Sequence, residues 1–150
     1  MDKVDLAILR LLQANGRLSQ SELANEIGLS APATGERLRK LEQQGAITGY
    51  QAIINAESLG YTLLAFIAVT IEHSRFEEKF LNAMRKTVEV QECHHIAGED
   101  SYLLKVRCRD TRHLEHLISG VIKALTGVTK TRTTIVLSTR KESSALPIEE

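Results

Sequence analysis

Net charge, long apolar runs and cysteine are all scarce in this chain of 150 residues. The 19 Lys and Arg residues balance 19 Asp and Glu residues, so the formal net charge is zero, which argues against a general polyanion binder. The apolar run from Leu63 to Ile71 is too short to cross a bilayer as a helix, and the acidic start leaves no apolar signal core. We therefore expect a cytoplasmic protein with no membrane partner.

Two cysteines are present, and both fall in predicted strands. Because the chain carries no secretory marks, we expect Cys93 and Cys108 to be reduced thiols in or near a sheet rather than a disulfide. Cys93 and His95 would share one strand face, but a zinc site needs roughly three or four ligands and no further ligand is evident. We interpret His94 and His95 as strand-packing or surface residues, and expect no metal, no cofactor and no catalysis.

Capping and stop signals predict two short helices at the start of the chain. Apolar residues recur at helical spacing from Lys3 to Ala14, and Asp2 can cap this first helix. Ser19 and Glu22 form a capping box at the start of the second helix, and Gly28 supplies a left-handed stop. With a third helix directly after a tight turn, this is the spacing of a helix-turn-helix.

The third helix is expected to begin after Ser30 and to end at Gly45. Steps of about 100° per residue place Thr34, Leu38 and Leu41 on the side that we assign to the core. The neighbouring strip carries small, polar and cationic residues, namely Ala33, Glu36, Arg37 and Lys40. Such a strip suits a helix that enters the DNA major groove, although a solvated charged face is the alternative.

After residue 50 the pattern changes to strands that alternate with helices. The expected elements are a connecting strand at Ile47–Ile54, a turn at Glu57–Gly60, strands at 62–72, 88–97, 102–109 and 128–139, and helices at 74–86 and 114–125. Ser74 and Glu77 are expected to form a capping box on the first of these helices. The order β-α-β-β-α-β predicts an α+β, ferredoxin-like split fold with a four-stranded antiparallel sheet.

The domain boundaries follow from this change of pattern. We predict a helix-turn-helix domain at 1–50, a linker at 51–61, a ferredoxin-like domain at 62–141 and a tail at 142–150. The strand at 62–72 is apolar on both sides, although helices would cover only one face of the sheet. We therefore expect its second face to meet another subunit in a homodimer.

Four segments of the sequence resemble one known family. They are DKVDLAILRLLQANGRLSQSELA, LSAPATGERLRKLEQQGAITGY, GEDSYLL and GVTKTRTTIVLSTRKESSALPI, and together they span nearly the whole chain. In these segments the chain resembles the Lrp/AsnC, or feast/famine, transcriptional regulators. The resemblance implies a winged-type helix-turn-helix joined to a ligand-sensing αβ domain, dimers that often assemble to octamers, and control by amino acids or similar metabolites.

The resemblance also suggests site residues. Its DNA-facing or phosphate-facing positions correspond to Ser30, Ala33, Thr34, Arg37 and Lys40, with Glu36 and Arg39 beside them. Glu36 would repel phosphate unless it orients Arg39 or Lys40 or accepts a hydrogen bond from a cytosine. The effector positions correspond to the turn formed by Gly98, Glu99, Asp100, Ser101 and Tyr102, with Thr133 and Thr134 as residues that line the same pocket.

The chemistry of the turn fits an amino acid. Gly98 permits close backbone approach, backbone N–H groups can hold a carboxylate, and Asp100 can accept hydrogen bonds from an α-ammonium group. An ordinary β-turn is the alternative interpretation. The sequence thus predicts a sequence-specific regulator that binds promoter or operator DNA and whose assembly and DNA affinity respond to an amino acid effector. The alternatives are a tetrapyrrole-processing decarboxylase that uses histidines of the αβ domain, or a weakly specific, DNA-wrapping architectural protein.

Overall fold

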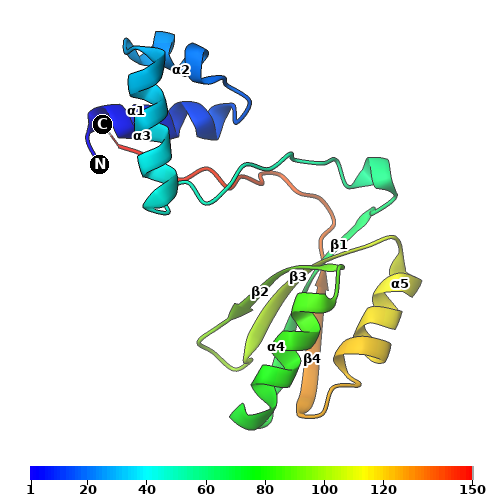
Figure 1. Ribbon diagram of the computed structural model, residues 1–150. Helices are drawn as coiled ribbons and strands as arrows, with labels where there is room; N and C mark the ends of the chain where they lie inside the picture. Colours follow the sequence, from blue (N-terminus) through cyan, green and yellow to red (C-terminus); the bar gives the residue numbers. More distant parts are fainter. Residues whose placement is uncertain (150) are drawn as a thin grey trace. The chain divides into compact units, whose positions relative to one another are not determined.

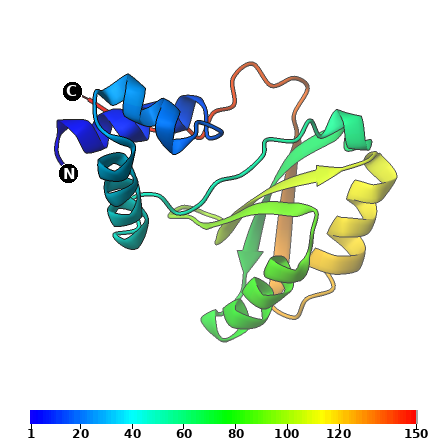
Figure 2. The same cartoon turned by 45° about the horizontal axis from the view of Figure 1, so that its top comes forward.

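The computed structural model describes residues 1–149, which fold into two compact units (Figures 1 and 2). The N-terminal unit contains Met1–Ile53 together with the C-terminal segment from Lys141, and the sheet unit contains Ile54–Arg140. The chain therefore passes between the two units twice. Among the described residues, no helix is both long and apolar enough to span a membrane.

Three helices build the N-terminal unit: α1 (Lys3–Ala14), α2 (Gln20–Ile27) and α3 (Ala31–Gln43). Their buried side chains form a small common core of Ile8, Leu23, Ala24, Thr34 and Leu41. The three helices begin and end close to where the caps and stops predict. This agreement arises because a helix terminus leaves backbone groups unpaired, and a local side chain or a glycine can satisfy them.

The caps themselves have the expected geometry. The Asp2 carboxylate accepts a hydrogen bond from the Asp5 backbone N–H at 2.9 Å, and the Asp5 carboxylate accepts one in return from the Asp2 N–H at 3.0 Å. Ser19 and Glu22 form the predicted reciprocal capping box on α2. Gly28 ends α2 in the left-handed conformation with a φ of 71°.

Gly35 lies inside α3, where glycine is unfavourable by about 1 kcal/mol relative to alanine. A Cβ at this position would come within 2.6 to 2.9 Å of the Gln20 side-chain amide. That amide donates a hydrogen bond to the backbone carbonyl of Ala31 in the first turn of α3. The missing Cβ thus leaves room for a side chain that ties α2 to α3, a reason that the sequence pattern does not reveal.

The predicted connecting strand at 47–54 is wrong. These residues form no strand, and several of their apolar side chains are exposed, with Ile53 at 96% of its maximum exposure. A strand requires a neighbouring backbone to pair with, and among the described residues the one sheet is built from four strands that all lie after residue 62. Alternating apolar residues without such a partner therefore remain an extended linker.

A pair of hydrogen bonds attaches the C-terminal segment to α1. The Gln13 side-chain amide donates to the Leu146 carbonyl at 3.1 Å and accepts from the Leu146 N–H at 2.7 Å. The red C-terminal end accordingly lies near the blue N-terminal helix in both views (Figures 1 and 2). The Gln13 amide thus bonds both the N–H and the carbonyl of Leu146, as the backbone of a neighbouring strand would.

We predict that Gln13→Ala speeds hydrogen exchange at the Leu146 amide by up to about tenfold, because a net hydrogen bond contributes about 0.5 to 1.5 kcal/mol. Residue-resolved exchange measured by NMR is the test. Leu146→Ala is the matched control, since both bonds use the backbone of residue 146. Equal exchange in wild type and Gln13→Ala would contradict the attachment.

The sheet unit contains four antiparallel strands: β1 (Leu63–Ile71), β2 (Val90–His95), β3 (Tyr102–Cys108) and β4 (Val128–Ile135). Their order in the sheet is β2-β3-β1-β4. Central strand β1 pairs with β3 on one side and with β4 on the other. This is the ferredoxin-like arrangement that the order of elements predicts.

One face of the sheet is covered by α4 (Glu77–Lys86) and by α5 (Thr111–Glu115) with its continuation η3 (His116–Ile122) (Figures 1 and 2). The core lies between these helices and alternate residues of β1 and β3. Its buried members are Ala65, Ile67, Val69, Phe80, Met84, Tyr102, Leu104, Val106, Cys108, Leu114, Leu117 and Ile122. The predicted alternation of β3 is confirmed, since every second residue from Tyr102 to Cys108 is buried.

Two helix predictions in this unit are wrong in detail. Instead of a Ser74 and Glu77 capping box, a 3-10 turn (η2, Ser74–Phe76) precedes α4, and the His73 ring nitrogen accepts from the Arg75 N–H at 3.2 Å. The second helix also leaves α geometry after Glu115, and η3 is a π-helical segment. Its apolar residues Leu117 and Ile122 are still buried in the core.

Candidate functional site

Five of the seven predicted DNA-facing residues lie exposed on or beside α3. They are Ser30, Ala33, Glu36, Arg39 and Lys40, and we refer to them as the α3 strip. Glu36, Arg39 and Lys40 also line a shallow hollow of about 250 Å³ on this helix, together with Arg37 and Gln43. Arg39 donates to the Glu36 carboxylate at 2.6 Å, and both side chains are well exposed, so this pair remains open to exchange with solvent or phosphate. Glu36 thus contacts Arg39, which is one of the two roles considered for it.

Thr34 and Arg37 both have partners within the protein, but only Thr34 is buried. Thr34 is fully buried and its hydroxyl donates to the Ser30 carbonyl at 3.0 Å, so its side chain is a core residue of α3. Arg37 donates to the Asp2 and Asp5 carboxylates at 2.7 Å each. The prediction that Thr34 faces DNA is therefore corrected, and its assignment to the core is confirmed. Arg37 is partly exposed, and its contact with DNA stays a prediction.

Asp2 was predicted only as a helix cap, and Asp5 was not predicted as a functional residue. Both form ion pairs with Arg37. The hydrogen bond from the Asp5 N–H, together with Arg37, lowers the pKa of Asp2. Burial alone would raise the pKa of Asp5, but the Asp2 N–H and the Arg37 guanidinium outweigh it, so the pKa is lowered. The two carboxylates in turn raise the pKa of Arg37.

These shifts predict an acid-sensitive contact between α1 and α3. A carboxyl whose pKa is lower in the folded state stabilises the fold above its unfolded pKa, which is about 3.9 for Asp, and loses this stabilisation as the pH falls through the folded pKa. We expect the charge-free Asp2→Asn/Asp5→Asn variant to lose less thermal stability than the wild type between about pH 5 and pH 2. Parallel losses of melting temperature in both proteins would contradict this expectation.

The predicted effector turn is centred on a buried acid. The Asp100 side chain is 5% exposed, accepts from the Thr70 hydroxyl at 3.0 Å and pairs with Arg132 at 2.5 Å. Arg132 comes from β4 and is 57% exposed. The turn thus contains a desolvated carboxylate whose cationic partner reaches it from the solvent side, an arrangement that binds ammonium or guanidinium groups.

The other turn residues have different environments. Ser101 is structural, because its N–H donates to the Val69 carbonyl at 2.9 Å and its hydroxyl accepts from the Ile71 N–H at 3.0 Å. Tyr102 is buried beneath α4, with its ring 5.1 Å from Phe80. Glu99 is exposed. A Cβ on Gly98 would meet nothing within 4 Å, so the space beside its backbone is open.

Thr133 and Thr134 point to opposite faces of the sheet and cannot line one pocket. Thr133 pairs with Ile67, which faces the helices, whereas Thr134 pairs with Phe66 on the other face. Arg132 pairs with Ala68 and therefore shares the face of Thr134. The joint prediction for the two threonines is wrong, because successive strand residues alternate between faces. Thr134 is the one that lies on the side of the Asp100–Arg132 pair.

The sequence reasoning missed Arg132 and Thr70 as partners of Asp100. Both lie about thirty residues from it, since Thr70 is separated by 30 positions and Arg132 by 32. Only the sheet register brings them together. The segment GVTKTRTT carries two cationic residues, Lys130 and Arg132, but its sequence does not indicate which acid either of them pairs with.

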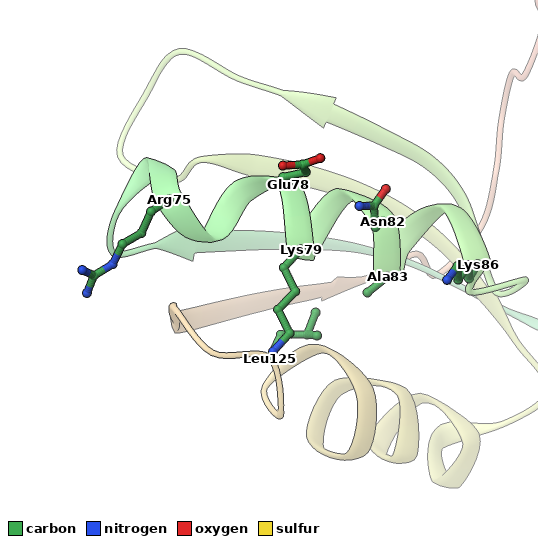
Figure 3. A pocket seen from close by; sticks show the side chains of 7 residues that line it. All are labelled: Arg75, Glu78, Lys79, Asn82, Ala83, Lys86 and Leu125. Carbon is green, nitrogen blue, oxygen red and sulfur yellow. The ribbon is translucent and has the colours of Figure 1, made fainter.

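A separate hollow of about 560 Å³ lies along α4 (Figure 3). It is lined by Arg75, Glu78, Lys79, Asn82, Ala83, Lys86 and Leu125, and the Lys79 side chain extends from the helix toward Leu125. None of the predicted effector residues lines it. Several of its lining side chains are exposed, flexible cations, and such residues alone do not indicate which ligand would bind.

The histidines and cysteines of the sheet unit have separate environments within the described part of the chain. Cys93 is half-buried and Cys108 is buried, and both thiols are free. His95 stacks on Tyr102 with ring centroids 5.0 Å apart. Burial raises the pKa of both thiols, that of Cys108 to about 11, which disfavours the reactive thiolate. Within residues 1–149, no group of three or more His, Cys, Asp or Glu side chains could hold a metal ion.

Comparison with known proteins agrees with both units. Residues 1–48 match the family model for winged helix-turn-helix DNA-binding, and residues 64–146 match that for the Lrp/AsnC ligand binding domain. The leucine-responsive regulatory protein of Escherichia coli K12 is 39% identical over 151 aligned positions, which cover 99% of this chain and 92% of that protein.

Solved structures agree as well. A transcriptional regulator from Neisseria meningitidis, in complex with L-methionine, has a TM-score of 0.94 and 34% identity over 98% of this chain and 96% of its own. A feast or famine regulatory protein from M. tuberculosis, complexed with L-methionine, has a TM-score of 0.90 and 38% identity over 99% of each chain. The chain therefore belongs to the Lrp/AsnC family and is a DNA-binding transcriptional regulator with a ligand-binding domain.

Proposed function

We propose that this regulator binds promoter or operator DNA sequence-specifically through α3, and that an α-amino acid bound near Asp100 changes its assembly and its DNA affinity. The observation that carries the effector part is the nearly buried Asp100 carboxylate at the turn between β2 and β3. The relatives from N. meningitidis and M. tuberculosis, both described as complexes with L-methionine, support an amino acid as the ligand class.

The amino acid would exchange with Arg132. Its α-ammonium group can replace the Arg132 guanidinium at the Asp100 carboxylate, because Arg132 is half-exposed and can return to solvent. The open space beside Gly98 leaves the backbone of the turn accessible to the α-carboxylate. Thr134 lies on the same face and is retained in the proposed site, whereas Thr133 and Tyr102 are not.

The α3 strip is the proposed DNA-reading surface. Lys40 and Arg39 supply cations for phosphates or guanine edges, and exposed Ala33 suits contact with a thymine methyl group. With no net charge on the chain, one such strip binds weakly, so several copies are needed for useful affinity. Two strips in a dimer that meet successive major grooves predict half-sites about 34 Å apart or a multiple of this distance.

Homodimerisation through the helix-free face of the sheet is part of the proposal, with octamers as the larger assembly. Phe66 of β1 and Leu103 of β3 are only partly buried on this face, although both are apolar. A second copy of the sheet would remove them from water. Sedimentation that finds a compact monomer at micromolar concentration would contradict this part.

We expect no catalytic activity, because the Cys93 and His95 side chains pack within the sheet unit rather than converge with other reactive groups. We place the protein in the cytoplasm, since a regulator must reach its DNA.

Calorimetric titration with each amino acid, followed by promoter binding with and without the one that binds, tests the proposal. Linkage requires the effector and the DNA to change each other's affinity by the same factor. We expect at least one amino acid to bind and to shift both the assembly and the DNA affinity. If none binds, or if binding alters neither property, the effector part is wrong.

A further inference from the structure

The Arg37 side chain of α3 contacts two carboxylates, those of Asp2 and Asp5. Its Nη1 atom lies 2.7 Å from an Asp2 oxygen and 2.7 Å from an Asp5 oxygen. Asp5 is 12% exposed and Asp2 is 55% exposed, while Arg37 itself is 32% exposed. The guanidinium thus contacts one nearly buried and one partly exposed carboxylate, which together more than neutralise its charge.

The two carboxylates are themselves held in place. Each accepts a hydrogen bond from the backbone N–H of the other in the capping box of α1. Their oxygens are therefore fixed by the end of one helix and bound to the side chain of another. An ion pair between preorganised groups loses little side-chain entropy on forming, unlike a pair between two flexible surface residues.

We infer that Asp2 and Asp5 hold the Arg37 guanidinium against α1 and so withhold this cation from the phosphates of DNA. The inference rests on the α3 strip proposed above as the DNA-reading surface. Neighbouring Lys40 is exposed, and Arg39 has only a solvated partner in Glu36. Lys40 and Arg39 are therefore available to DNA, whereas Arg37 is paired with the acids of α1.

The salt dependence of DNA affinity distinguishes these two kinds of cation. Each phosphate contact changes the slope of log affinity against log salt concentration by about 0.9. The probe is a 30-base-pair duplex of mixed sequence, titrated with the full-length protein at several salt concentrations. We expect Lys40→Gln to flatten the slope by about 0.9 and Arg37→Gln to leave it unchanged.

Removal of the carboxylates should release Arg37. The Asp2→Asn/Asp5→Asn variant keeps side chains that can cap α1, because Asn is as good a cap as Asp. We expect its slope to steepen by about 0.9 and its affinity at about 50 mM salt to rise on the order of tenfold. The matched control is Glu26→Gln/Glu57→Gln, which removes two exposed acids and should leave the slope unchanged.

Different outcomes would contradict the role of Arg37 and the role of the α3 strip. If Arg37→Gln flattens the slope as much as Lys40→Gln, Arg37 contacts phosphate and the inference is wrong. A slope that changes equally in the Asn double variant and in the Gln control would overturn it as well. If Lys40→Gln has no effect, the α3 strip is not the DNA surface and the inference fails with it.

Thermal unfolding provides a second measurement that does not involve DNA. Arg37→Gln leaves the Asp5 carboxylate without its cation, so the melting temperature should fall. Addition of Asp5→Asn to this variant should restore part of the loss, because the uncompensated charge is then gone. Strictly additive changes in melting temperature would show that the two residues are not coupled and would overturn the inference.

Discussion

Gly127→Ala is expected to lower the free energy of unfolding by about 2 to 5 kcal/mol, the sum of a left-handed backbone penalty and a steric clash. Gly127 has a φ of 93°, and a Cβ on it would lie 2.4 Å from the Phe76 ring. The clash includes the Cβ of Phe76, at 2.5 Å, so rotation of the ring cannot relieve it. Chemical denaturation of the full chain measures the loss.

The control for this prediction is Gly98→Ala. Gly98 has no positive φ, and its added Cβ would meet nothing within 4 Å. Its free energy of unfolding should stay the same or rise by less than about 1 kcal/mol, because alanine restricts the unfolded chain. Similar losses in both variants would show that the conformation of Gly127 does not explain its effect.

Asp100→Asn is expected to weaken effector binding by about 10- to 150-fold, because a hydrogen bond to a charged group contributes about 1.5 to 3 kcal/mol. The asparagine oxygen can still accept from the Thr70 hydroxyl, so the turn should keep its conformation. What is lost is the negative charge that holds an α-ammonium group. Titration calorimetry with the amino acid that binds the wild type gives the ratio of affinities.

Glu99→Gln is the matched comparison, since it removes the same charge from the adjacent residue. Glu99 is exposed and solvent screens its carboxylate, so we expect a change in affinity of less than about threefold. If Glu99→Gln weakens binding more than Asp100→Asn does, the α-ammonium acceptor has been assigned to the wrong residue. Thermal unfolding of both variants identifies any general loss of stability.

The parts of the fold that the sequence predicted depend on neighbours within a few residues. Asp2, Ser19 and Ser30 cap the helices they were expected to cap, because each satisfies a backbone group two or three positions away. The alternation from Tyr102 to Cys108 was equally visible, since burial on one face of a strand repeats every second residue.

The parts that the sequence did not predict depend on residues distant in the chain. The ion pairs of Arg37 join it to acids that lie 32 and 35 positions away in the sequence. Asp100 and Arg132 meet only through the sheet register. The linker at 47–54 has strand-like residues but no backbone to pair with. In each case the local sequence pattern does not contain the identity of the distant residue or strand that decides the contact.

The error at Thr133 and Thr134 has a different origin. The rule of alternating faces was available from the sequence, and it excludes one pocket for two successive strand residues. The rule shows that only one of Thr133 and Thr134 can line the pocket, and the sheet register, which places Thr134 on the face of Arg132, decides which. The candidate site could therefore be narrowed further from sequence than the resemblance alone suggested.

The return of the chain at Lys141 makes the ligand-binding unit an insert within the DNA-binding one. A host that receives an insert is joined to it by two covalent tethers instead of one. Because both ends of the insert are joined to the host, its chain is restricted as in a closed loop, and this costs conformational entropy. Cleavage of the polypeptide between residues 136 and 141 would remove this restriction and still leave each unit with its complete set of helices and strands.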